Sequence, residues 1–268
     1  MMFKEQVSES WNKRFGSEPP ADLDPIAPFL AHRSVRRFTD EAISTETMAG
    51  LVAAAQSAAT SSNLQSWSAI SVQNPEKRHA IAEACANQKQ VETAAAFFVF
   101  LADLNRIHRY AVAHEIDPDG LDTAEMYTVA VIDAALAAER MVCAAEALGY
   151  GICYIGALRN HPDRVREILN LPEKTFGIFG LCIGRPAENA RADIKPRLSQ
   201  DQVWFEEEYP ESLNSREYDQ RAAEYFASHA MSTDEPWSKK SGRRVQTIGL
   251  SGREALLTFL HEQGLLKR

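Results

Sequence analysis

The sequence contains few cysteines and no arrangement of them that is typical of a disulfide framework or a metal cluster. Its 4 cysteines, Cys85, Cys143, Cys153 and Cys182, are far apart, and no CxxC pair occurs. The 7 histidines form no zinc motif, because no two of them stand four positions apart with a glutamate between them. We therefore interpret the cysteines as buried, reduced thiols that act as small hydrophobic residues.

The sequence also lacks a long apolar run. The longest uninterrupted one extends from Ala94 to Ala102, which is far too short to cross a bilayer. The amino-terminal stretch MMFKEQVSESWNKRF has no apolar core of the kind found in signal peptides. These features predict a cytoplasmic protein that does not interact with membranes. The absence of GxGxxG and of GxxxxGK[ST] argues against a Rossmann dinucleotide site and a P-loop.

Excess positive charge is absent as well. The formal net charge is -8 at pH 7 and the sequence pI is about 5.5. Such a balance disfavours broad attraction to nucleic acid or anionic lipid, although it leaves room for a local basic pocket. With 268 residues, of which 45% are hydrophobic, the chain can bury a sizeable core in one domain or in one domain with an extension.

Patterns of apolar residues predict helices and strands in the first half of the chain. A polar amphipathic stretch at the amino terminus indicates a surface helix, followed by the Pro-punctuated turn GSEPPADLDP. Ser44 is expected to cap a helix that ends near Thr60, and Asn74 to cap a second helix over 75–85. Between them, WSAISVQ alternates as a strand does. The segment AAAFFVFLAD, which is apolar up to Ala102, indicates a central strand buried on both faces.

The second half begins with the longest helical pattern, from Thr123 to Leu148. This segment is rich in alanine and apolar around much of its circumference, so it needs packing partners on more than one side. It is therefore either a core helix within one subunit or a helix at the interface between two subunits. Gly149 and Gly151 are expected to end it. ICYIGAL and GIFGLCIG predict two further strands on either side of the helix PDRVREIL.

After Pro186 the sequence becomes polar, which predicts an extended arm. Helical spacing returns in REYDQRAAEYFASHA and REALLTFLHEQGLL, with a loop rich in Ser, Gly, Lys and Arg between them. The whole layout predicts an α+β fold with a core over 1–186 and a mostly helical extension over 187–268.

Two clusters of cations are candidates for binding a phosphate. The heptapeptide HRSVRRF places Arg33, Arg36 and Arg37 around a serine, and IKPRL places Lys195 and Arg197 on either side of a proline that stiffens the backbone. The guanidinium group matches the oxygens of a phosphate with two parallel hydrogen bonds. Each cluster by itself is equally typical of a solvated surface, so the context decides.

That context is a polar junction between a predicted helix and a predicted strand. ATSSNLQSWS gathers more hydrogen-bonding side chains than a capped turn uses, and the excess suits a polyol or the edge of a pyrimidine. Gly156, directly after a predicted strand, allows a planar ligand to approach the backbone closely. These features favour a nucleotide-like ligand in a pocket that is not of the Rossmann type.

The order of these motifs resembles the oxygen-insensitive nitroreductase and flavin reductase branch of the FMN-dependent nitroreductase family. HRSVRRF, SSNLQSWS, NQK, YIGALRN, FGLCIGRPAE and KPRL follow one another along the chain. The resemblance implies a mixed sheet flanked by helices in a domain-interlocked homodimer, with each FMN at the dimer interface. It also implies that the 123–148 helix packs against its copy. The extension would carry the FMN-phosphate loop and a helical arm that wraps the partner subunit.

The resemblance further implies which residues bind FMN. Arg33 and Ser34 are expected to join Lys195 and Arg197 at the phosphate. The polar junction and Gln88 are expected to serve the isoalloxazine and ribityl groups, and the backbone of the YIGAL segment to lie against the dimethylbenzene and N5 side. The full expected set is His32, Arg33, Ser34, Arg36, Ser61, Ser62, Asn63, Gln65, Gln88, Tyr154, Ile155, Gly156, Ala157, Leu158, Lys195 and Arg197.

The activity implied is that of an NAD(P)H-dependent oxidoreductase, a flavoprotein with ping-pong kinetics. A nicotinamide delivers hydride to flavin N5, and a nitroaromatic, quinone or flavin acceptor then takes the electrons. No side-chain catalyst and no metal are expected, because the cofactor supplies the chemistry. Another FMN reaction on the same scaffold is the main alternative, either reductive dehalogenation or oxidation of a specific metabolite. A non-catalytic oligomeric protein is the alternative from a different class.

One segment departs from the pattern of the resemblance. Where relatives carry arginines thought to meet the 2′-phosphate of NADPH, this sequence reads SHAMSTDEPWS. Asp234 and Glu235 would repel a 2′-phosphate, which predicts weakened discrimination between NADPH and NADH. Nearby cations would reverse this if the chain folds back over the loop: Lys239, Lys240, Arg243 and Arg244. His229, in the same stretch, and Arg253 are expected to bind substrate.

Overall fold

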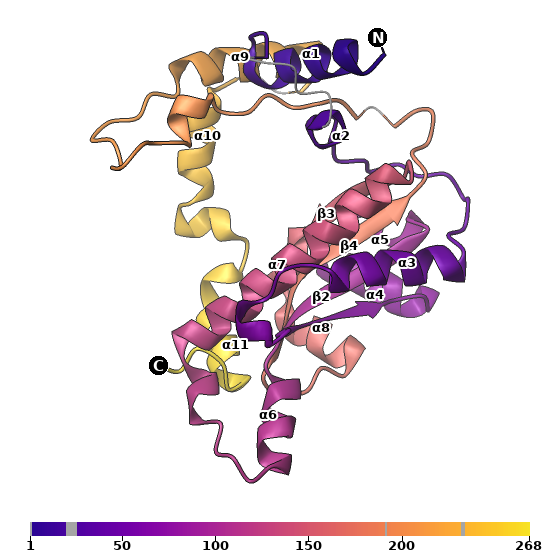
Figure 1. Cartoon of the computed structure of the whole chain (residues 1–268), viewed down its shortest axis with the longest axis vertical. Helices are drawn as coiled ribbons and strands as arrows, with labels where there is room; N and C mark the ends of the chain where they lie inside the picture. Colours follow the sequence, from indigo (N-terminus) through magenta and orange to yellow (C-terminus); the bar gives the residue numbers. More distant parts are fainter. Residues whose placement is uncertain (1, 20–25, 191, 232–233) are drawn as a thin grey trace. The chain divides into compact units, whose positions relative to one another are not determined.

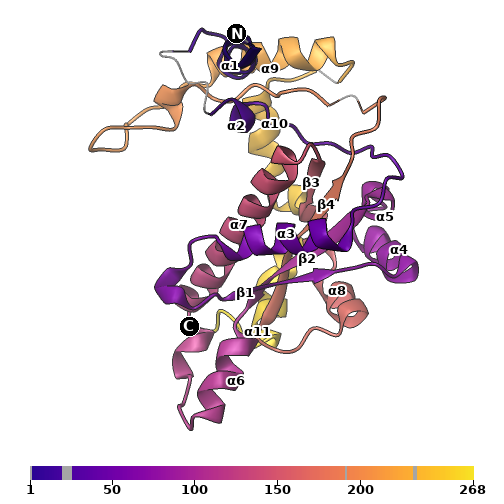
Figure 2. The ribbon, with the colours of Figure 1, turned by 45° about the vertical axis from the view of Figure 1, so that its right-hand side comes forward.

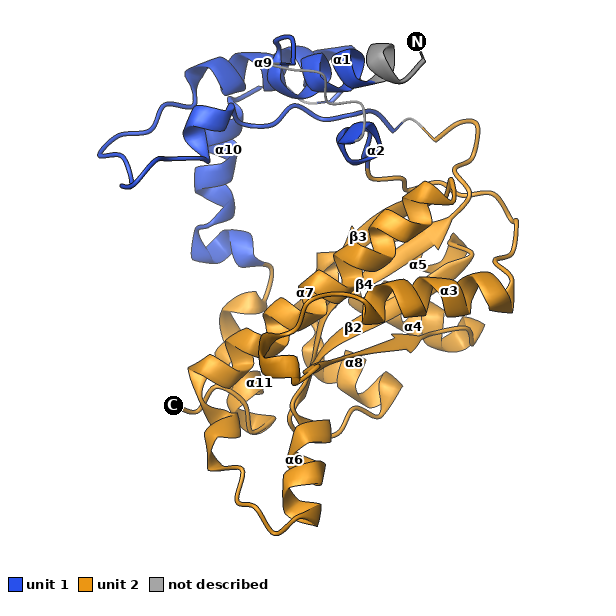
Figure 3. Ribbon diagram, in the orientation of Figure 1, with its two compact units in different colours: residues 1–33, 192–250 blue, residues 34–191, 251–268 orange. Residues whose placement is uncertain are grey.

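The structure is a computed structural model that describes residues 2–19, 26–190, 192–231 and 234–268 (Figure 1). Parts of GSEPPADLDP and SHAMSTDEPWS therefore lie outside the described residues. The chain divides into two compact units (Figure 3). Unit 1 comprises Met1–Arg33 and Ala192–Leu250, and unit 2 comprises Ser34–Arg191 and Ser251–Arg268. The predicted boundary at 186 stays a prediction. Among the described residues, no helix combines the length and the apolar character needed to span a bilayer.

Unit 2 is built on one four-stranded sheet with the order β1-β2-β4-β3, in which every neighbouring pair is antiparallel. The strands are β1 (Trp67–Ser71), β2 (Ala96–Asp103), β3 (Gly151–Ile155) and β4 (Thr175–Gly184). β2 is an inner strand and all of its residues are buried, which confirms the predicted central strand. A parallel bridge between Ser34 and Ile152 adds the only parallel pairing in the described chain.

Helices α3 and α7 cover one face of this sheet (Figures 1 and 2). They span Thr45–Gln56 and Ala124–Ala147. The Ser44 hydroxyl accepts the N–H of Thr47 at 3.1 Å, so the predicted cap of α3 is confirmed. The helix ends at Gln56, before the expected Thr60. Phe98 and Phe100 of β2 point into the core that these two helices close.

Helices α4, α5 and α8 cover the opposite face (Figure 2). They span Pro75–Ala84, Gln90–Thr93 and Pro162–Leu169. The Asn74 side chain accepts the N–H of Lys77 at 2.9 Å, which confirms the second predicted cap. Phe97 and Val99, which alternate with the phenylalanines of the other face, pack in this second core. The sheet is therefore buried on both sides.

One helix forms where the sequence predicts none, and another forms where it predicts a loop. α6 spans Asn105–Ala113, directly after β2, and α10 spans Trp237–Arg244, within the Ser-, Gly-, Lys- and Arg-rich segment. Glu235, which lies two residues before α10, pairs with Lys239 and Arg243 of the helix. These ion pairs along the helix offset the low helix propensity of Ser and Gly, which explains why the prediction of a loop was wrong.

The other helices lie at the two ends of the chain. Unit 1 contains α1 (Met2–Phe15), α2 (Ala27–Leu30), α9 (Arg216–Ser228) and α10. Unit 2 ends with α11 (Leu256–Glu262). The helix expected over REALLTFLHEQGLL is thus shorter than its pattern, because its start is a 3-10 turn over Arg253–Ala255 and Gly264 takes a φ of +71°.

Candidate functional site

The part of the heptapeptide HRSVRRF that belongs to unit 2 begins along the free edge of β3, where Ser34 pairs with Ile152. The N–H of Val35 donates to the carbonyl oxygen of Ile152 at 2.8 Å. Gly151 makes this close approach possible, because a Cβ at that position would lie 2.6 Å from a methyl group of Val35. Ser34 and Arg36 are thereby held beside the strand that leads into the YIGAL segment.

The arginines of this heptapeptide are available to an anion. Arg33 and Arg36 are exposed, and neither side chain has a hydrogen-bond or ion-pair partner among the described residues. Arg37 is exposed in the same way. An exposed guanidinium without an internal partner retains its full set of donors for a phosphate.

In unit 1, Arg14 links the start of the heptapeptide to the proline-flanked cations. This arginine, at the end of α1, is only 6% exposed. Its Nη2 donates to the carbonyl oxygen of His32 at 2.7 Å. The carbonyl oxygen of Arg14 in turn accepts the N–H of Arg197 at 2.8 Å. Arg14 therefore ties the backbone at His32 to the backbone at Arg197 in unit 1. The expected phosphate site of Arg33, Ser34, Lys195 and Arg197 stays a prediction.

The loop between α3 and β1, residues 60–66, has an unusual backbone; we call it the serine-rich loop. Ser62, Asn63 and Gln65 take φ values of 48°, 55° and 53°. Non-glycine side chains rarely adopt this left-handed region, and each such residue costs on the order of 1 kcal/mol or more. A loop with this conformation persists only where its surroundings fix it.

Asp133 of α7 fixes the serine-rich loop, and sequence reasoning missed this residue. Its side chain is buried, with a relative exposure of 1%. The carboxylate accepts hydrogen bonds from the Thr60 hydroxyl at 2.6 Å and from the N–H groups of Ser61 and Ser66, each at 3.0 Å. The only signal in the sequence is a single acidic residue within the apolar run YTVAVIDAALAA.

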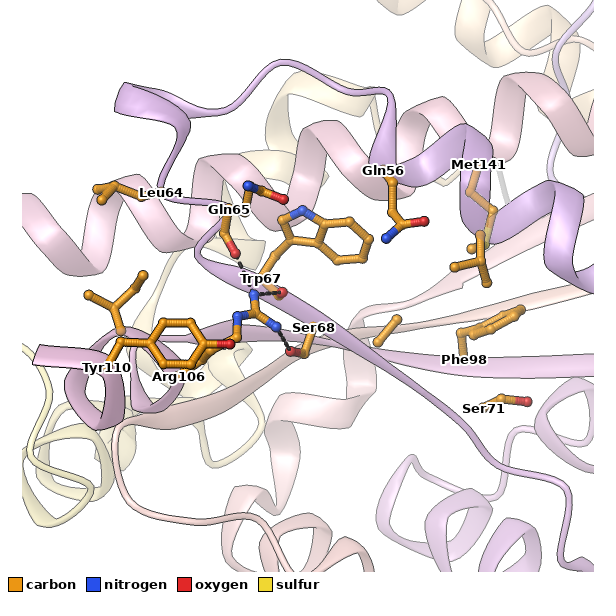
Figure 4. A pocket seen from close by; sticks show the side chains of 13 residues that line it. Gln56, Leu64, Gln65, Trp67, Ser68, Ser71, Phe98, Arg106, Tyr110 and Met141 are labelled. Atoms are coloured by element: carbon orange, nitrogen blue, oxygen red, sulfur yellow. Dashed lines mark hydrogen bonds between the residues drawn. The ribbon is translucent and has the colours of Figure 1, made fainter. Parts of the chain in front are cut away.

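Arg106 of α6 holds the other end of the serine-rich loop. Its guanidinium donates to the carbonyl oxygens of Gln65 and Trp67 and to the hydroxyl of Ser68, as Figure 4 shows. These residues line a cavity of about 550 Å³ that extends over β1 toward α3 and α7.

Four side chains of the serine-rich loop stay exposed in this arrangement, whereas the Thr60 hydroxyl is bonded to Asp133 and Ser66 is buried. The hydroxyls of Ser61 and Ser62 are exposed and, in the described chain, make no hydrogen bond. The amides of Asn63 and Gln65 are exposed and contact each other only at 3.5 Å. Because the backbone contacts hold the loop, its hydroxyls and amides remain available to a ligand.

The YIGAL segment runs from the last strand residues of β3 into a 3-10 helix, Gly156–Asn160. A Cβ at Gly156 would meet only the guanidinium of Arg159, at 3.6 Å, so the backbone here is open to close approach. The phenol of Tyr154 donates to Glu139 at 3.1 Å. Burial, together with that carboxylate, raises the pKa of Tyr154, so the phenol stays a neutral donor.

Gln88 lies in the turn between α4 and α5. The side-chain oxygen Oε1 of Gln88 accepts the side-chain N–H of the buried Gln90 at 2.7 Å. One end of the Gln88 amide is therefore engaged within the protein, and its NH₂ group keeps its two donors.

The two residues expected to bind substrate are held by different contacts. In unit 2, Arg253 donates through Nε to the side-chain oxygen of Asn160 at 2.8 Å, at the end of the YIGAL 3-10 helix. In unit 1, His229 caps α9, and its Nδ1 lies 2.8 Å from the carbonyl oxygen of Tyr225. Arg253 is thus tied to a segment of the expected flavin site.

One acid of the acidic loop, Glu235, forms ion pairs with two cations of α10. The side chain of Glu235 lies 3.0 Å from the ammonium of Lys239 and also contacts the guanidinium of Arg243. The hydrogen bond from Lys239 is the largest of the effects that lower the pKa of Glu235. Lys239 and Arg243 thus fold back over Glu235 and offset its repulsion of a 2′-phosphate.

The described residues fit a flavin mononucleotide. Within unit 1, the exposed guanidinium of Arg33, which has no partner among the described residues, suits the phosphate. Within unit 2, the exposed hydroxyls and amides of the serine-rich loop suit the ribityl chain and the pyrimidine, and the open backbone at Gly156 suits the planar ring. These donors sit on segments that buried side chains hold in place. This class of site agrees with the α+β architecture around it.

Comparison with known proteins assigns the chain to a family. It matches the Nitroreductase family over residues 30–185 and the Nitroreductase family, C-terminal domain, over residues 195–268. The chain belongs to the nitroreductase family, as the order of its motifs predicts.

Similar proteins include well-described enzymes. The FMN reductase (NADPH) of Bacillus subtilis is 40% identical over 220 residues, which cover 80% of this chain and 88% of that protein. The oxygen-insensitive NADPH nitroreductase of Salmonella typhimurium is 39% identical over 252 residues, which cover 92% of this chain and 100% of that one. The solved structure of the NfrA1 nitroreductase from B. subtilis superposes with a TM-score of 0.84 at 37% identity, covering 91% and 99% of the two chains.

Proposed function

We propose that this chain is an FMN-dependent NAD(P)H oxidoreductase that reduces nitroaromatic, quinone or flavin acceptors. The names of its similar relatives, an FMN reductase and an oxygen-insensitive nitroreductase that use NADPH, support this activity. The observation that carries it is the link through Arg14, which in unit 1 ties the backbone at His32 to the backbone at Arg197. Cations on two backbone segments tied in this way are suited to one phosphomonoester.

The FMN-binding residues proposed are those named from the sequence. Arg33, Ser34, Lys195 and Arg197 bind the phosphate, with His32 and Arg36 beside them. Support comes from the exposed, unpartnered guanidinium of Arg33. The remaining contacts come from the serine-rich loop, from Gln88 and from the YIGAL backbone: Ser61, Ser62, Asn63, Gln65, Gln88, Tyr154, Ile155, Gly156, Ala157 and Leu158.

The role of the protein is to bind and orient. The redox chemistry is that of FMN, which accepts a hydride at N5 and then reduces the acceptor. The cations and N–H groups of this chain stabilise negative charge on the ring system and the phosphate. Arg253 is proposed to contact the acceptor, and its bond to Asn160 limits the positions that its guanidinium can take. His229 is proposed as a second substrate contact.

The electron donor proposed is NADPH, with NADH as a weaker substitute. The relatives are named for NADPH. The ion pairs of Glu235 with Lys239 and Arg243 offset one of the two acidic charges of the loop. Weakened discrimination between NADPH and NADH stays a prediction, which kinetics with both nucleotides test.

A homodimer is also proposed, in which α7 packs against its copy and the extension wraps the partner subunit. Ile132 and Leu136 stand on the face of α7 away from the sheet and are 49% and 43% exposed. Large apolar side chains in a row on a central helix are typical of an interface with a second copy. We place the protein in the cytoplasm, where its free thiols would stay reduced.

Steady-state kinetics test this activity. Initial rates are measured with NADPH and with NADH against a nitroaromatic compound, a quinone and free FMN. Parallel double-reciprocal lines and a higher kcat/KM for NADPH are expected. Turnover of none of these acceptors, with activity only on a halogenated or a specific metabolite, would favour the alternative FMN reaction on this scaffold. A protein that never binds FMN would favour the non-catalytic alternative.

A further inference from the structure

We propose that Asp133 is a positioning residue: its buried carboxylate shapes the serine-rich loop before FMN binds. This inference rests on the proposed function, because the purpose of the shape is to present the loop to FMN. Asp133 itself touches no expected ligand group. It acts through Thr60 and through the backbone of the loop.

The carboxylate closes both ends of the loop at once. Oδ1 accepts the N–H of Ser61, and Oδ2 accepts the hydroxyl of Thr60 and the N–H of Ser66. The residues between these two amides include all of the left-handed positions in the loop. One side chain therefore fixes the separation of the ends, and the intervening residues take up the strain.

A relay through Thr60 extends this control to the middle of the loop. The Thr60 hydroxyl donates to Asp133 and accepts the N–H of Gln65 at 2.8 Å. The orientation of the hydroxyl is thereby fixed, because its single proton points to the carboxylate. Gln65, one of the expected FMN contacts, is held in its left-handed conformation by this chain of two hydrogen bonds.

The chemistry of the position requires a carboxylate. Asp133 is buried and, among the described residues, it has no cation beside it; its hydrogen-bond partners in the described chain are N–H and O–H donors. A buried carboxylate without an ion pair lowers the free energy of unfolding. An apolar residue at this position of the Ala-rich helix would avoid that cost. An asparagine has one acceptor oxygen and one NH₂ group, so it would set a donor against at least one donor of the loop. We infer that the charge serves the loop rather than the core.

The test uses two pairs of variants. Asp133→Asn is compared with Glu125→Gln, which removes an exposed carboxylate from the same helix. Thr60→Val, which removes the relay hydroxyl at nearly constant volume, is compared with Thr60→Ser, which keeps it. The dissociation constant of FMN for each apoprotein is measured from the quenching of flavin fluorescence. Hydrogen exchange of the Ser61, Gln65 and Ser66 amides is measured in the same apoproteins.

Asp133→Asn and Thr60→Val are expected to weaken FMN binding by about tenfold or more, because each breaks hydrogen bonds to a charged group. The same variants are expected to lose amide protection in the serine-rich loop without FMN. Glu125→Gln and Thr60→Ser are expected to bind FMN with a dissociation constant within about threefold of that of the parent protein. This change is smaller than the change expected from the loss of one such hydrogen bond. Equal FMN affinity and equal amide protection in the parent protein and Thr60→Val would overturn the inference.

The readouts separate this inference from the proposed function. If the parent protein binds no FMN, the proposed function fails, and protection of the loop amides alone decides whether Asp133 shapes the loop. If Asp133→Asn does not fold, the Thr60 pair gives the result, because Thr60 is only half-buried. A loss of thermal stability in Thr60→Val with unchanged FMN affinity and unchanged loop protection would show a merely structural role and overturn the inference.

Discussion

The guanidinium of Arg14 is bonded to the carbonyl oxygen of His32, 18 positions along the chain, at a distance of 2.7 Å. A second nitrogen of the same group donates to the carbonyl oxygen of Leu30 at 2.8 Å. A buried cation that binds two carbonyl oxygens fixes the backbone that enters the heptapeptide. The geometry of the proposed phosphate site thus depends on a residue that does not itself face the ligand.

Replacing Arg14 tests this dependence. Arg14→Met removes both hydrogen bonds, each worth roughly 1.5 to 3 kcal/mol because the donor is charged, so the dissociation constant of FMN is expected to rise by about tenfold or more. Arg14→Lys keeps the charge but has a single nitrogen, so its dissociation constant for FMN is expected to lie between those of the parent protein and Arg14→Met. Lys13→Gln, which removes a cation at the neighbouring surface position, is the control. Equal FMN affinity in Arg14→Met and the control would contradict the link.

The phosphate assignment is tested by comparing two flavins. Arg33→Ala is expected to weaken FMN binding by roughly tenfold, the value of one partly desolvated charge-assisted hydrogen bond, and to leave riboflavin binding unchanged. Arg37→Ala is the matched control, since Arg37 is equally exposed and belongs to the same heptapeptide. Fluorescence titration measures both ligands. If Arg33→Ala weakens the binding of riboflavin as much as that of FMN, Arg33 does not bind the phosphate.

Asn160 is expected to act on the acceptor through Arg253. Asn160→Ala removes the oxygen that accepts from Nε of Arg253, which should raise the KM of a quinone acceptor by about threefold to tenfold, the value of one hydrogen bond. Asn160→Asp keeps the acceptor oxygen and should stay near the parent value. The flavin content of both variants is measured in parallel. A fall in flavin content that accounts for the lost activity would place Asn160 in the FMN site instead.

From the burial of the Cys85 thiol we expect the free energy of unfolding to fall at alkaline pH. Burial raises the pKa of Cys85 from an ordinary value of 9.0 to about 12. The folded protein therefore holds this proton more tightly than the unfolded chain does. The stabilisation is complete below about pH 9 and is lost as the pH rises toward 12.

Denaturant unfolding of the parent protein and of Cys85→Ala between pH 8 and pH 11 measures this effect. The free energy of unfolding of the parent is expected to fall more steeply above pH 9, because its unfolded thiol ionises first. Identical slopes for the two proteins would show that Cys85 does not contribute.

The elements with strong local signals could be predicted from the sequence. Ser44 and Asn74 stand where helices begin, and the strand that follows Ala94 is apolar at nearly every position because both faces of the sheet are covered. These features depend on neighbours along the chain, so a pattern of a few residues contains them.

The contacts that hold the candidate site could not be predicted in this way. Asp133 and Thr60 are 73 positions apart, and in sequence Asp133 looks like an ordinary polar residue on a helix. Arg14 looks like a cation that ends a helix, and its role appears only when its partner His32 is placed beside it. Such residues owe their function to tertiary neighbours, for which a single sequence gives no local signal.

The most direct test of the proposed function is the visible spectrum of the purified protein, recorded before and after anaerobic addition of NADPH. The account predicts the absorption bands of bound FMN, their bleaching by NADPH, and their return when a nitroaromatic or quinone acceptor is added. A protein that stays colourless after incubation with FMN, or whose bound flavin is not bleached by either NADPH or NADH, would contradict it.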